Sequence, residues 1–184
     1  MIVCAGNNET FPFATPIGVG LIESAINLTQ ICLFDKPDYI LFVGSAGSYS
    51  SDNYKIFDIV ESSNGANIEL SFLNGDSYTP IDNLLKCEDL KFSSETIINS
   101  SNYITTNSSI SKQFLQYGIG LENMEFYSVV KVAQQFGIDV RGIFVVTNYT
   151  NKDAHKEFIS NHQDALDKLV SYLEEKKVIV PRRT

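Results

Sequence analysis

The sequence contains no tryptophan, only two histidines and only three cysteines in 184 residues. Cys4, Cys32 and Cys87 are odd in number and far apart, which argues against a disulfide framework and against a zinc site with paired cysteines. We expect them to be small core residues of a protein in the reducing cytoplasm. His155 and His162 lie in a charged helical segment without other metal-ligand types nearby, so we predict no metal site and expect both to be solvated.

Long apolar runs are absent as well, and none approaches the length of a membrane span. Residues 1–6 are apolar but lack the basic flank of a secretory signal, so we expect a first strand there. Acidic residues outnumber basic ones by 22 to 14 and are scattered, which gives a net charge of −8. This balance disfavours nucleic acid and a membrane as partners and favours a small, neutral or weakly charged ligand.

The apolar pattern is that of an α/β protein, because strand-like runs alternate with helix-like ones. We predict a single three-layer α/β/α domain, residues 1–184, with a central mixed, mostly parallel sheet. Strands are expected at residues 1–5, 11–17, 39–44, 55–60, 68–73, 102–106, 118–122 and 141–148, and helices at 18–34, 124–136 and 155–177. The apolar face of the first helix is predicted from residues at helical spacing, namely Ile22, Ala25, Ile26, Thr29 and Leu33. Residues 178–184 are expected to be a frayed tail.

The most informative stretch is Gly44-Ser45-Ala46-Gly47, which follows the apolar strand. We expect these small residues to form a turn in which Gly44 and Gly47 let the backbone approach a ligand. Ser45 would offer a hydroxyl with backbone N–H groups beside it, which suits an anion, a water or a sugar. An ordinary tight turn is the alternative.

Two further polar residues stand beside predicted element ends. Glu125 falls in the first turn of a helix, and Asn148 falls at the carboxyl end of the last strand, where open α/β sheets bind ligands. Each also has a purely structural explanation. A helix dipole stabilises an acid such as Glu125 at the helix start, and asparagine is common in turns.

Five segments in order resemble one enzyme family and together cover most of the chain: Ile17-Gly18-Val19-Gly20, Gly44-Ser45-Ala46-Gly47, Asp58-Ile59-Val60, Glu122-Asn123-Met124-Glu125 and Val146-Thr147-Asn148. The chain is similar to the nucleoside phosphorylase and nucleosidase superfamily, which includes purine nucleoside and uridine phosphorylases and methylthioadenosine/adenosylhomocysteine nucleosidases. In that family the glycine-serine turn borders the attacking phosphate or water, and a Met-Glu pair holds the ribose. The resemblance therefore implies a nucleophile side at Gly44, Ser45, Ala46 and Gly47, and a ribose side at Met124 and Glu125.

The activity implied by the resemblance is cleavage of the N-glycosidic bond of a purine nucleoside. We expect phosphorolysis first, with phosphate as co-substrate, no cofactor, and a homo-oligomer in the cytoplasm. Bond cleavage passes through an oxocarbenium-like sugar, so the Glu125 carboxylate would orient the ribose hydroxyls and favour the developing positive charge. Met124 would place a soft apolar surface under the sugar.

The chain departs from the family at the base and phosphate positions. Many members have aspartate where Asn148 falls, and an amide cannot deliver a proton at neutral pH. Some phosphorylases of 6-oxopurine nucleosides resemble this chain in using asparagine there, which favours inosine- or guanosine-like ligands. The only arginines are Arg141, Arg182 and Arg183, and none falls in the family's phosphate positions.

Two alternatives therefore stay open. One is a purine nucleosidase of the methylthioadenosine/adenosylhomocysteine or futalosine type that uses water, with Glu9 as the base. The other is a non-catalytic nucleoside-binding paralogue. An aromatic residue is expected to stack on the base; Tyr103 and Phe126 are candidates, and the sequence assigns neither.

Overall fold

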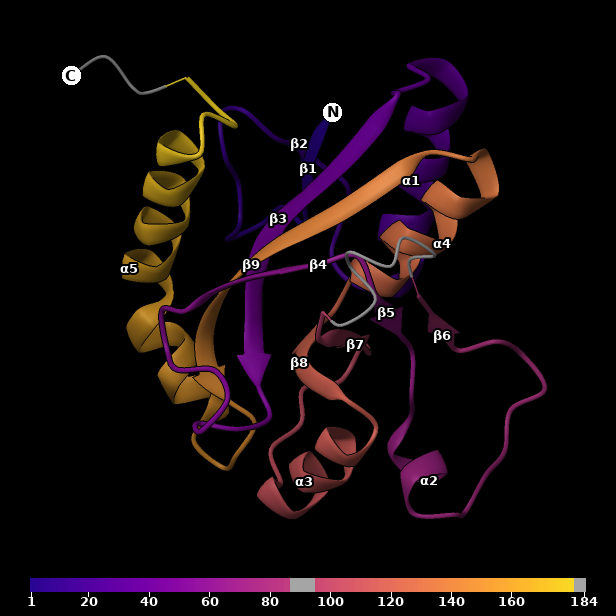
Figure 1. The fold of residues 1–184 in the computed structure, drawn as a ribbon, viewed down its shortest axis with the longest axis vertical. Coiled ribbons are helices and arrows are strands. Elements are labelled where there is room, and N and C mark those ends of the chain that lie inside the picture. Colours follow the sequence, from indigo (N-terminus) through magenta and orange to yellow (C-terminus); the bar gives the residue numbers. More distant parts are fainter. Residues whose placement is uncertain (87–94, 181–184) are drawn as a thin grey trace.

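The computed structural model describes residues 1–86 and 95–180 of the chain (Figure 1). The strands are β1 (Ile2–Cys4), β2 (Thr15–Pro16), β3 (Tyr39–Ser48), β4 (Ile59–Ser62), β5 (Gly65–Ala66), β6 (Leu84–Leu85), β7 (Ile97–Ser100), β8 (Ile119–Asn123) and β9 (Asp139–Tyr149). The helices are α1 (Leu21–Phe34), α2 (Leu70–Leu73), α3 (Ser108–Gln116), α4 (Phe126–Phe136) and α5 (Ala154–Glu175). Strands and helices alternate for most of the chain, as predicted.

The long strand β3 organises the sheet. It pairs in parallel with β9 along its whole length, from Tyr39 to Ser48. On its other edge β3 pairs first with β1, in parallel, and farther along with β8, antiparallel. The remaining pairs are parallel between β1 and β2, β5 and β7, and β7 and β8, and antiparallel between β4 and β9 and between β5 and β6. The predicted mixed, mostly parallel sheet is confirmed.

Helices cover both faces of the sheet, with α5 on one side of β3 and β9 and with α1 and α4 on the other (Figure 1). Alternate residues of β3 explain this arrangement, because successive side chains of a strand point to opposite faces. Phe42 packs with Phe126 and Phe144 under α1 and α4, while Val43 packs against the α5 side. A fully buried side chain of this size contributes about 1.5–3 kcal/mol to folding.

The predicted turn at Gly44-Ser45-Ala46-Gly47 is wrong, because these residues continue β3 and pair with β9, with a shift of register between Ala46 and Gly47. Glycine fits at positions 44 and 47 because there is little room for a side chain, not because the chain turns there. A Cβ on Gly44 would lie 2.8 Å from Glu9 Oε2, and one on Gly47 would lie 3.0 Å from Asn148 Nδ2. The small residues thus let polar side chains of other segments lie directly on the strand.

The middle of the chain departs most from the prediction. The strand expected at residues 68–73 is wrong, because Leu70–Leu73 form the short helix α2. Residues 102–106 form no strand but an irregular segment, although their β-branched side chains suggested one. The strand expected at residues 55–60 begins only at Ile59, after a turn. Strand propensity depends on packing against neighbours, so it fails where a segment is exposed or unpaired.

The buried face of α1 also differs from the prediction, since Ile22, Ile26 and Leu33 are all more than half exposed. The buried positions of this helix are instead Ser24, Leu28 and Cys32. A serine can be buried here because the Ser24 hydroxyl donates to the Gly20 carbonyl oxygen at 2.6 Å. The helix therefore leaves apolar side chains on the surface.

The cysteine prediction is confirmed for Cys4 and Cys32, which are free and buried, while Cys87 lies outside the described residues. Ile179 packs against the core on the α5 side, and residues 181–184 of the expected tail also lie outside the described residues. In the part of the chain that the structure describes, no helix is long and apolar enough to cross a membrane. The cytoplasmic location stays a prediction.

Candidate active site

A pocket of about 310 Å³ opens beside β3, between the strand partners β1 and β8 on the same edge. The structure brings most of the predicted site residues together in its lining: Glu9, Ser45, Ala46, Gly47, Met124, Glu125 and Asn148. Gly44 does not line the pocket. Three carboxyl groups line it, those of Glu9, Glu122 and Glu125, and no lysine or arginine does so among the described residues.

Ser45 fixes Glu9 to the edge of β3, between the segments that pair with β1 and β8. The Ser45 hydroxyl donates to Glu9 Oε1, and the Ser45 backbone N–H donates to Glu9 Oε2 at 3.1 Å. A strand edge without a partner leaves backbone groups that need hydrogen bonds, and the glutamate supplies an acceptor. The Ser45 N–H and hydroxyl therefore bond Glu9, and the role of Ser45 on the nucleophile side stays a prediction.

Asn123 is a site residue to which the sequence analysis gave no role. Its Nδ2 donates to the Ser45 carbonyl oxygen at 3.2 Å, and its Oδ1 accepts from the backbone N–H groups of Glu125 and Phe126 at 2.7 and 2.8 Å. Asn123 thus caps the start of α4 and ties it to β3. Its capping residue type, just before a helical pattern, was the available signal.

Glu125 lies at the start of α4, as predicted, and only 3% of its surface is exposed. Its Oε1 accepts from the Gly20 backbone N–H at 2.9 Å, so the loop before α1 helps to orient it. Burial, with the nearby charge of Glu9 adding to it, raises the pKa of Glu125 to about 7, although the Gly20 hydrogen bond opposes this. A half-buried Met124 lines the pocket beside it. These neighbours leave carboxylate lone pairs for the hydroxyls of a ligand.

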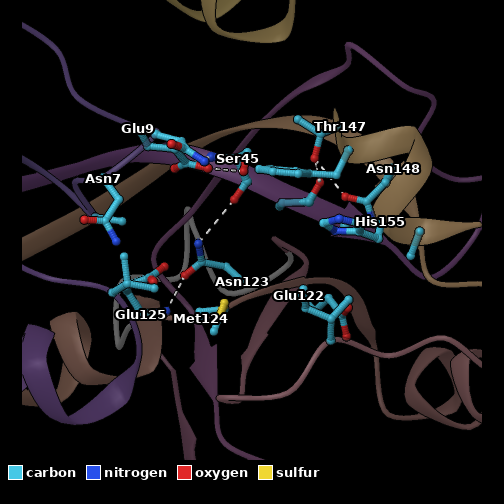
Figure 2. Close-up of a pocket in the computed structure, with 18 of the residues that line it drawn as sticks. Asn7, Glu9, Ser45, Glu122, Asn123, Met124, Glu125, Thr147, Asn148 and His155 are labelled. Carbon is cyan, nitrogen blue, oxygen red and sulfur yellow. Dashed lines mark hydrogen bonds between the residues drawn. The ribbon is translucent and has the colours of Figure 1, made fainter. Parts of the chain in front are cut away.

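The other end of the pocket is built around Gly47. This glycine pairs with Glu122 on β8 and with Asn148 on β9, so the two side chains lie on either side of it. A Cβ on Gly47 would meet both Asn148 Nδ2, at 3.0 Å, and Glu122 Cγ, at 3.3 Å. Asn148 Oδ1 accepts from the Thr147 hydroxyl at 2.9 Å. Figure 2 shows Glu9 and Glu125 at one end of the pocket, with Asn148, Glu122 and His155 at the other.

Glu122 was part of the family-like segment but was given no role from the sequence. It is 9% exposed, and its carboxyl accepts from the Tyr49 hydroxyl at 2.9 Å and from the Thr105 backbone N–H at 3.0 Å. Burial raises its pKa to about 7, against the lowering effect of the hydrogen bonds from Thr105 and Tyr49. Burial and the charge of Glu122 in turn raise the pKa of Tyr49. Apart from that segment, the signal for Glu122 in the sequence was a glutamate near the end of an apolar strand.

The structure also bears on the candidates for base stacking and on the positions of the arginines. Phe126 is fully buried against Phe42 and Phe144, so it is wrong as a base-stacking residue, whereas the exposed Tyr103 lines the pocket. Arg141 lies away from the pocket, where its guanidinium bonds Glu61 and Glu95. Arg182 and Arg183 lie outside the described residues.

The histidines differ from each other. His155, in the first turn of α5, is exposed as predicted, but it also lines the pocket near Asn148 (Figure 2). His162 is half-buried, and its Nε2 hydrogen-bonds with the Asn8 carbonyl oxygen at 3.0 Å. Through Asn8, α5 supports the loop that carries Glu9.

Comparisons with known proteins are informative at the level of structure. No family model matches the sequence, and no curated protein matches it significantly. A futalosine hydrolase variant from Helicobacter pylori superposes with a TM-score of 0.77 at 16% identity, covering 94% of this chain and 95% of that one. A methylthioadenosine nucleosidase variant from the same organism, with 5′-methylthioadenosine in its active site, gives a TM-score of 0.75 at 17% identity over 88% of this chain and 78% of that one.

The MTA/SAH nucleosidase of Streptococcus pneumoniae, in complex with 8-aminoadenine, gives a TM-score of 0.73 at 13% identity over 94% and 95% of the two chains. Such low identities establish the fold and not the reaction. The order of the elements, the mixed sheet and these superpositions agree with the resemblance seen in the sequence. The chain has the fold of the nucleoside phosphorylase and nucleosidase superfamily.

Proposed function

We propose that this protein is a purine nucleosidase, which cleaves the N-glycosidic bond of its substrate with water. The observation that carries the proposal is the charge of the pocket, where three carboxyl groups and no lysine or arginine occur among the described lining residues. Two like unit charges 4 Å apart cost about 4 kcal/mol at an effective dielectric constant of 20. A phosphate anion beside Glu9 would meet this repulsion without a cation to offset it, whereas a water molecule would not.

Glu9 is the base in this proposal. The Ser45 hydroxyl and N–H both donate to its carboxylate and hold it at the edge of β3. The Glu9 carboxylate would accept a proton from water as the water attacks the anomeric carbon of the sugar. Across the pocket, Glu125 would accept hydrogen bonds from the ribose hydroxyls, with Met124 against the sugar.

The solved structures support this choice over the phosphorolysis that was expected first. The similar proteins are described as nucleosidases and as a futalosine hydrolase, and one contains 5′-methylthioadenosine in its active site. A pocket on this fold can therefore hold a purine nucleoside. For this chain, the absence of lysine and arginine from the described lining residues supports the same conclusion independently of the comparison.

Cleavage assays with and without phosphate test the reaction type. Inosine, guanosine, adenosine and 5′-methylthioadenosine are incubated with the protein, and the free sugar is distinguished from the sugar 1-phosphate. We expect the free sugar at a rate independent of phosphate, and a loss on the order of 10²-fold or more in Glu9→Gln. Glu175→Gln, an exposed glutamate at the end of α5, is the matched control. A strict requirement for phosphate would contradict the proposal.

A second candidate is nucleoside binding without turnover, which Asn148 favours because an amide cannot donate a proton at neutral pH. The Helicobacter pylori nucleosidase that holds 5′-methylthioadenosine is itself an aspartate-to-asparagine variant. Calorimetric binding of a nucleoside by the wild type, with no product after long incubation, would support this candidate. Turnover of any nucleoside by the wild type would eliminate it.

The homo-oligomer implied by the resemblance stays a prediction. The exposed apolar side chains of α1, Ile22 and Ile26 among them, are the first positions to test. Sedimentation velocity of the wild type and of Ile26→Asp decides it. A monomeric wild type contradicts the prediction, and a wild-type oligomer that Ile26→Asp dissociates supports both the prediction and this face.

A further inference from the structure

We propose that Glu122 is the general acid that protonates the leaving base, a role that the amide of Asn148 cannot fill. This inference rests on the hydrolysis proposed above and assigns the proton donor for the leaving base. A purine leaves readily only when a ring nitrogen receives a proton or a strong hydrogen bond, and a carboxylic acid can supply the proton.

The sheet register places Glu122 near Asn148, at the end of the pocket where we expect the base. Gly47 pairs with Glu122 on one side and Asn148 on the other, so both residues project from the same face of the sheet. Two strand spacings of about 4.8 Å separate their backbones by roughly 10 Å. Because Gly47 has no side chain, the side chains of Asn148 and Glu122 both lie close above it, and together they line this end of the pocket.

The hydrogen bonds of Glu122 suit an acid that gives its proton to a ligand. The Thr105 N–H and the Tyr49 hydroxyl both donate to the carboxyl. These donors stabilise the carboxylate that remains after proton transfer, because they favour the charged form. Burial acts in the opposite direction and holds the pKa near neutrality, where a general acid is most effective.

The other carboxyl groups of the pocket have different surroundings. Glu9 is held by Ser45 and Glu125 by the Gly20 N–H, both at the opposite end of the pocket (Figure 2). Near the base end, Tyr49 bonds Glu122, and His155 and Tyr103 line the same pocket. Tyr49 is a poor acid because its pKa is raised further, and the exposed His155 is the competing candidate.

The proposed step balances in atoms and charge. As the bond between the anomeric carbon and the base nitrogen breaks, its electron pair stays with the base. The O–H bond of Glu122 breaks and an N–H bond forms on the base. On the other side, water oxygen bonds to the anomeric carbon and gives a proton to Glu9. One water is consumed, and solvent then takes the proton from Glu9 and returns one to Glu122.

Comparing two substrates of Glu122→Gln tests the assignment. Inosine needs a proton on its leaving base, whereas 7-methylinosine already carries the positive charge there. We expect Glu122→Gln to lower kcat for inosine on the order of 10²-fold or more, and to change kcat for 7-methylinosine by only a few-fold. A purely structural role for Glu122 would lower both alike, and that result would overturn the proposal.

Two controls separate this proposal from its competitors. Glu125→Gln acts on the ribose, so it should slow both substrates alike. A selective loss for inosine in His155→Ala, instead of in Glu122→Gln, would assign the proton to His155 and overturn the proposal. If the wild type hydrolyses both nucleosides and only the Glu122 result fails, the proposed function stands; if it cleaves neither, both fail.

The wild type alone offers a second measurement in case Glu122→Gln does not fold. The kcat of the wild type for inosine should fall as the pH rises above about 7, because Glu122 loses its proton there. The same limb should be absent with 7-methylinosine. A shared alkaline limb for both substrates would contradict the assignment. It would show that the titrating group, such as Tyr49 or His155, acts elsewhere than on the base.

Discussion

The two ends of the pocket contain carboxyl groups with the same pKa, about 7, in very different settings. At one end Glu125 bonds the backbone N–H of Gly20, and Glu9 bonds Ser45. At the other end Glu122 bonds the Tyr49 hydroxyl and the Thr105 N–H. Burial raises the pKa of both buried carboxyls, so the pKa alone does not separate their roles. Their positions in the pocket do, since Glu125 lies at the same end as Glu9, whereas Glu122 lies beside Gly47 and Asn148.

The largest expected effect is that of Glu125→Gln. An uncharged amide at this position removes the negative charge that favours the oxocarbenium-like sugar, so kcat/KM should fall roughly 10²- to 10³-fold. The fall should be equal for inosine, adenosine and 7-methylinosine, because the ribose is common to all. Steady-state kinetics on the three substrates measure it. The Gln side-chain oxygen can still accept from the Gly20 N–H at this buried site, so the fold should persist.

A base-dependent loss in Glu125→Gln would contradict the division of the pocket into two ends. Unchanged activity would remove the assignment of Glu125 to the ribose altogether. Circular dichroism and thermal unfolding of the variant show whether either result comes from a change of fold.

The residues of the site that could be predicted lie in segments with strong local patterns. A continuous apolar run identified the core of β3, and a 3.6-residue apolar period ending at Gly137 identified α4. These patterns placed Ser45, Glu125 and Asn148 at the ends or edges of elements, and the resemblance grouped them. Burial and strand pairing then bring them into one pocket, as expected for neighbouring elements of an α/β sheet.

The residues that could not be predicted depend on pairing between distant segments. Gly44 and Gly47 read as a turn, because sequence alone does not show that Glu9 and Asn148 occupy the space of their missing side chains. Glu122 had no role because its hydrogen bond with Tyr49 joins residues 73 positions apart. The α1 face was misassigned because Ser24 satisfies its own hydroxyl locally. Tertiary contacts overrode local preference in each case.

Substituting the two glycines of β3 would sharpen the comparison of the two ends. Gly44→Ala places a methyl group 2.8 Å from Glu9 Oε2, and Gly47→Ala places one 3.0 Å from Asn148 Nδ2. We expect Gly44→Ala to lower kcat for inosine and 7-methylinosine alike, by about tenfold, because the water-activating base moves. Gly47→Ala should instead raise KM, by a similar factor, because the methyl group would displace the side chains of Asn148 and Glu122 at the base end.

These two variants are matched controls for each other, since both add one methyl group to the same strand. Calorimetric binding of a free purine base separates them, because only Gly47→Ala should weaken it. Weaker binding of the base in Gly44→Ala, with unchanged binding in Gly47→Ala, would place the base at the opposite end of the pocket.

The smallest expected effect is on stability and follows from the raised pKa values of Glu122 and Glu125. Both carboxyls have a pKa of about 7 in the folded protein, against an ordinary value of 4.5. Between these pH values the folded state binds more protons than the unfolded state, so the free energy of unfolding should fall as the pH rises from 4.5 to about 7. Each carboxyl would contribute on the order of 1–3 kcal/mol to this fall.

Urea unfolding of the wild type, Glu122→Gln and Glu125→Gln between pH 5 and 8 measures this effect. Each Gln variant should flatten the curve, since an amide does not titrate, and the exposed Glu69→Gln should follow the wild type. All other titratable groups are common to the variants, so difference curves isolate the two carboxyls. Flattening by one variant only would show that a single end of the pocket holds a proton at neutral pH. The proposed acid, Glu122, must hold a proton before the reaction, and the ribose carboxylate, Glu125, must be ionised. Flattening by Glu122→Gln alone would match both of these states, and flattening by Glu125→Gln alone would match neither.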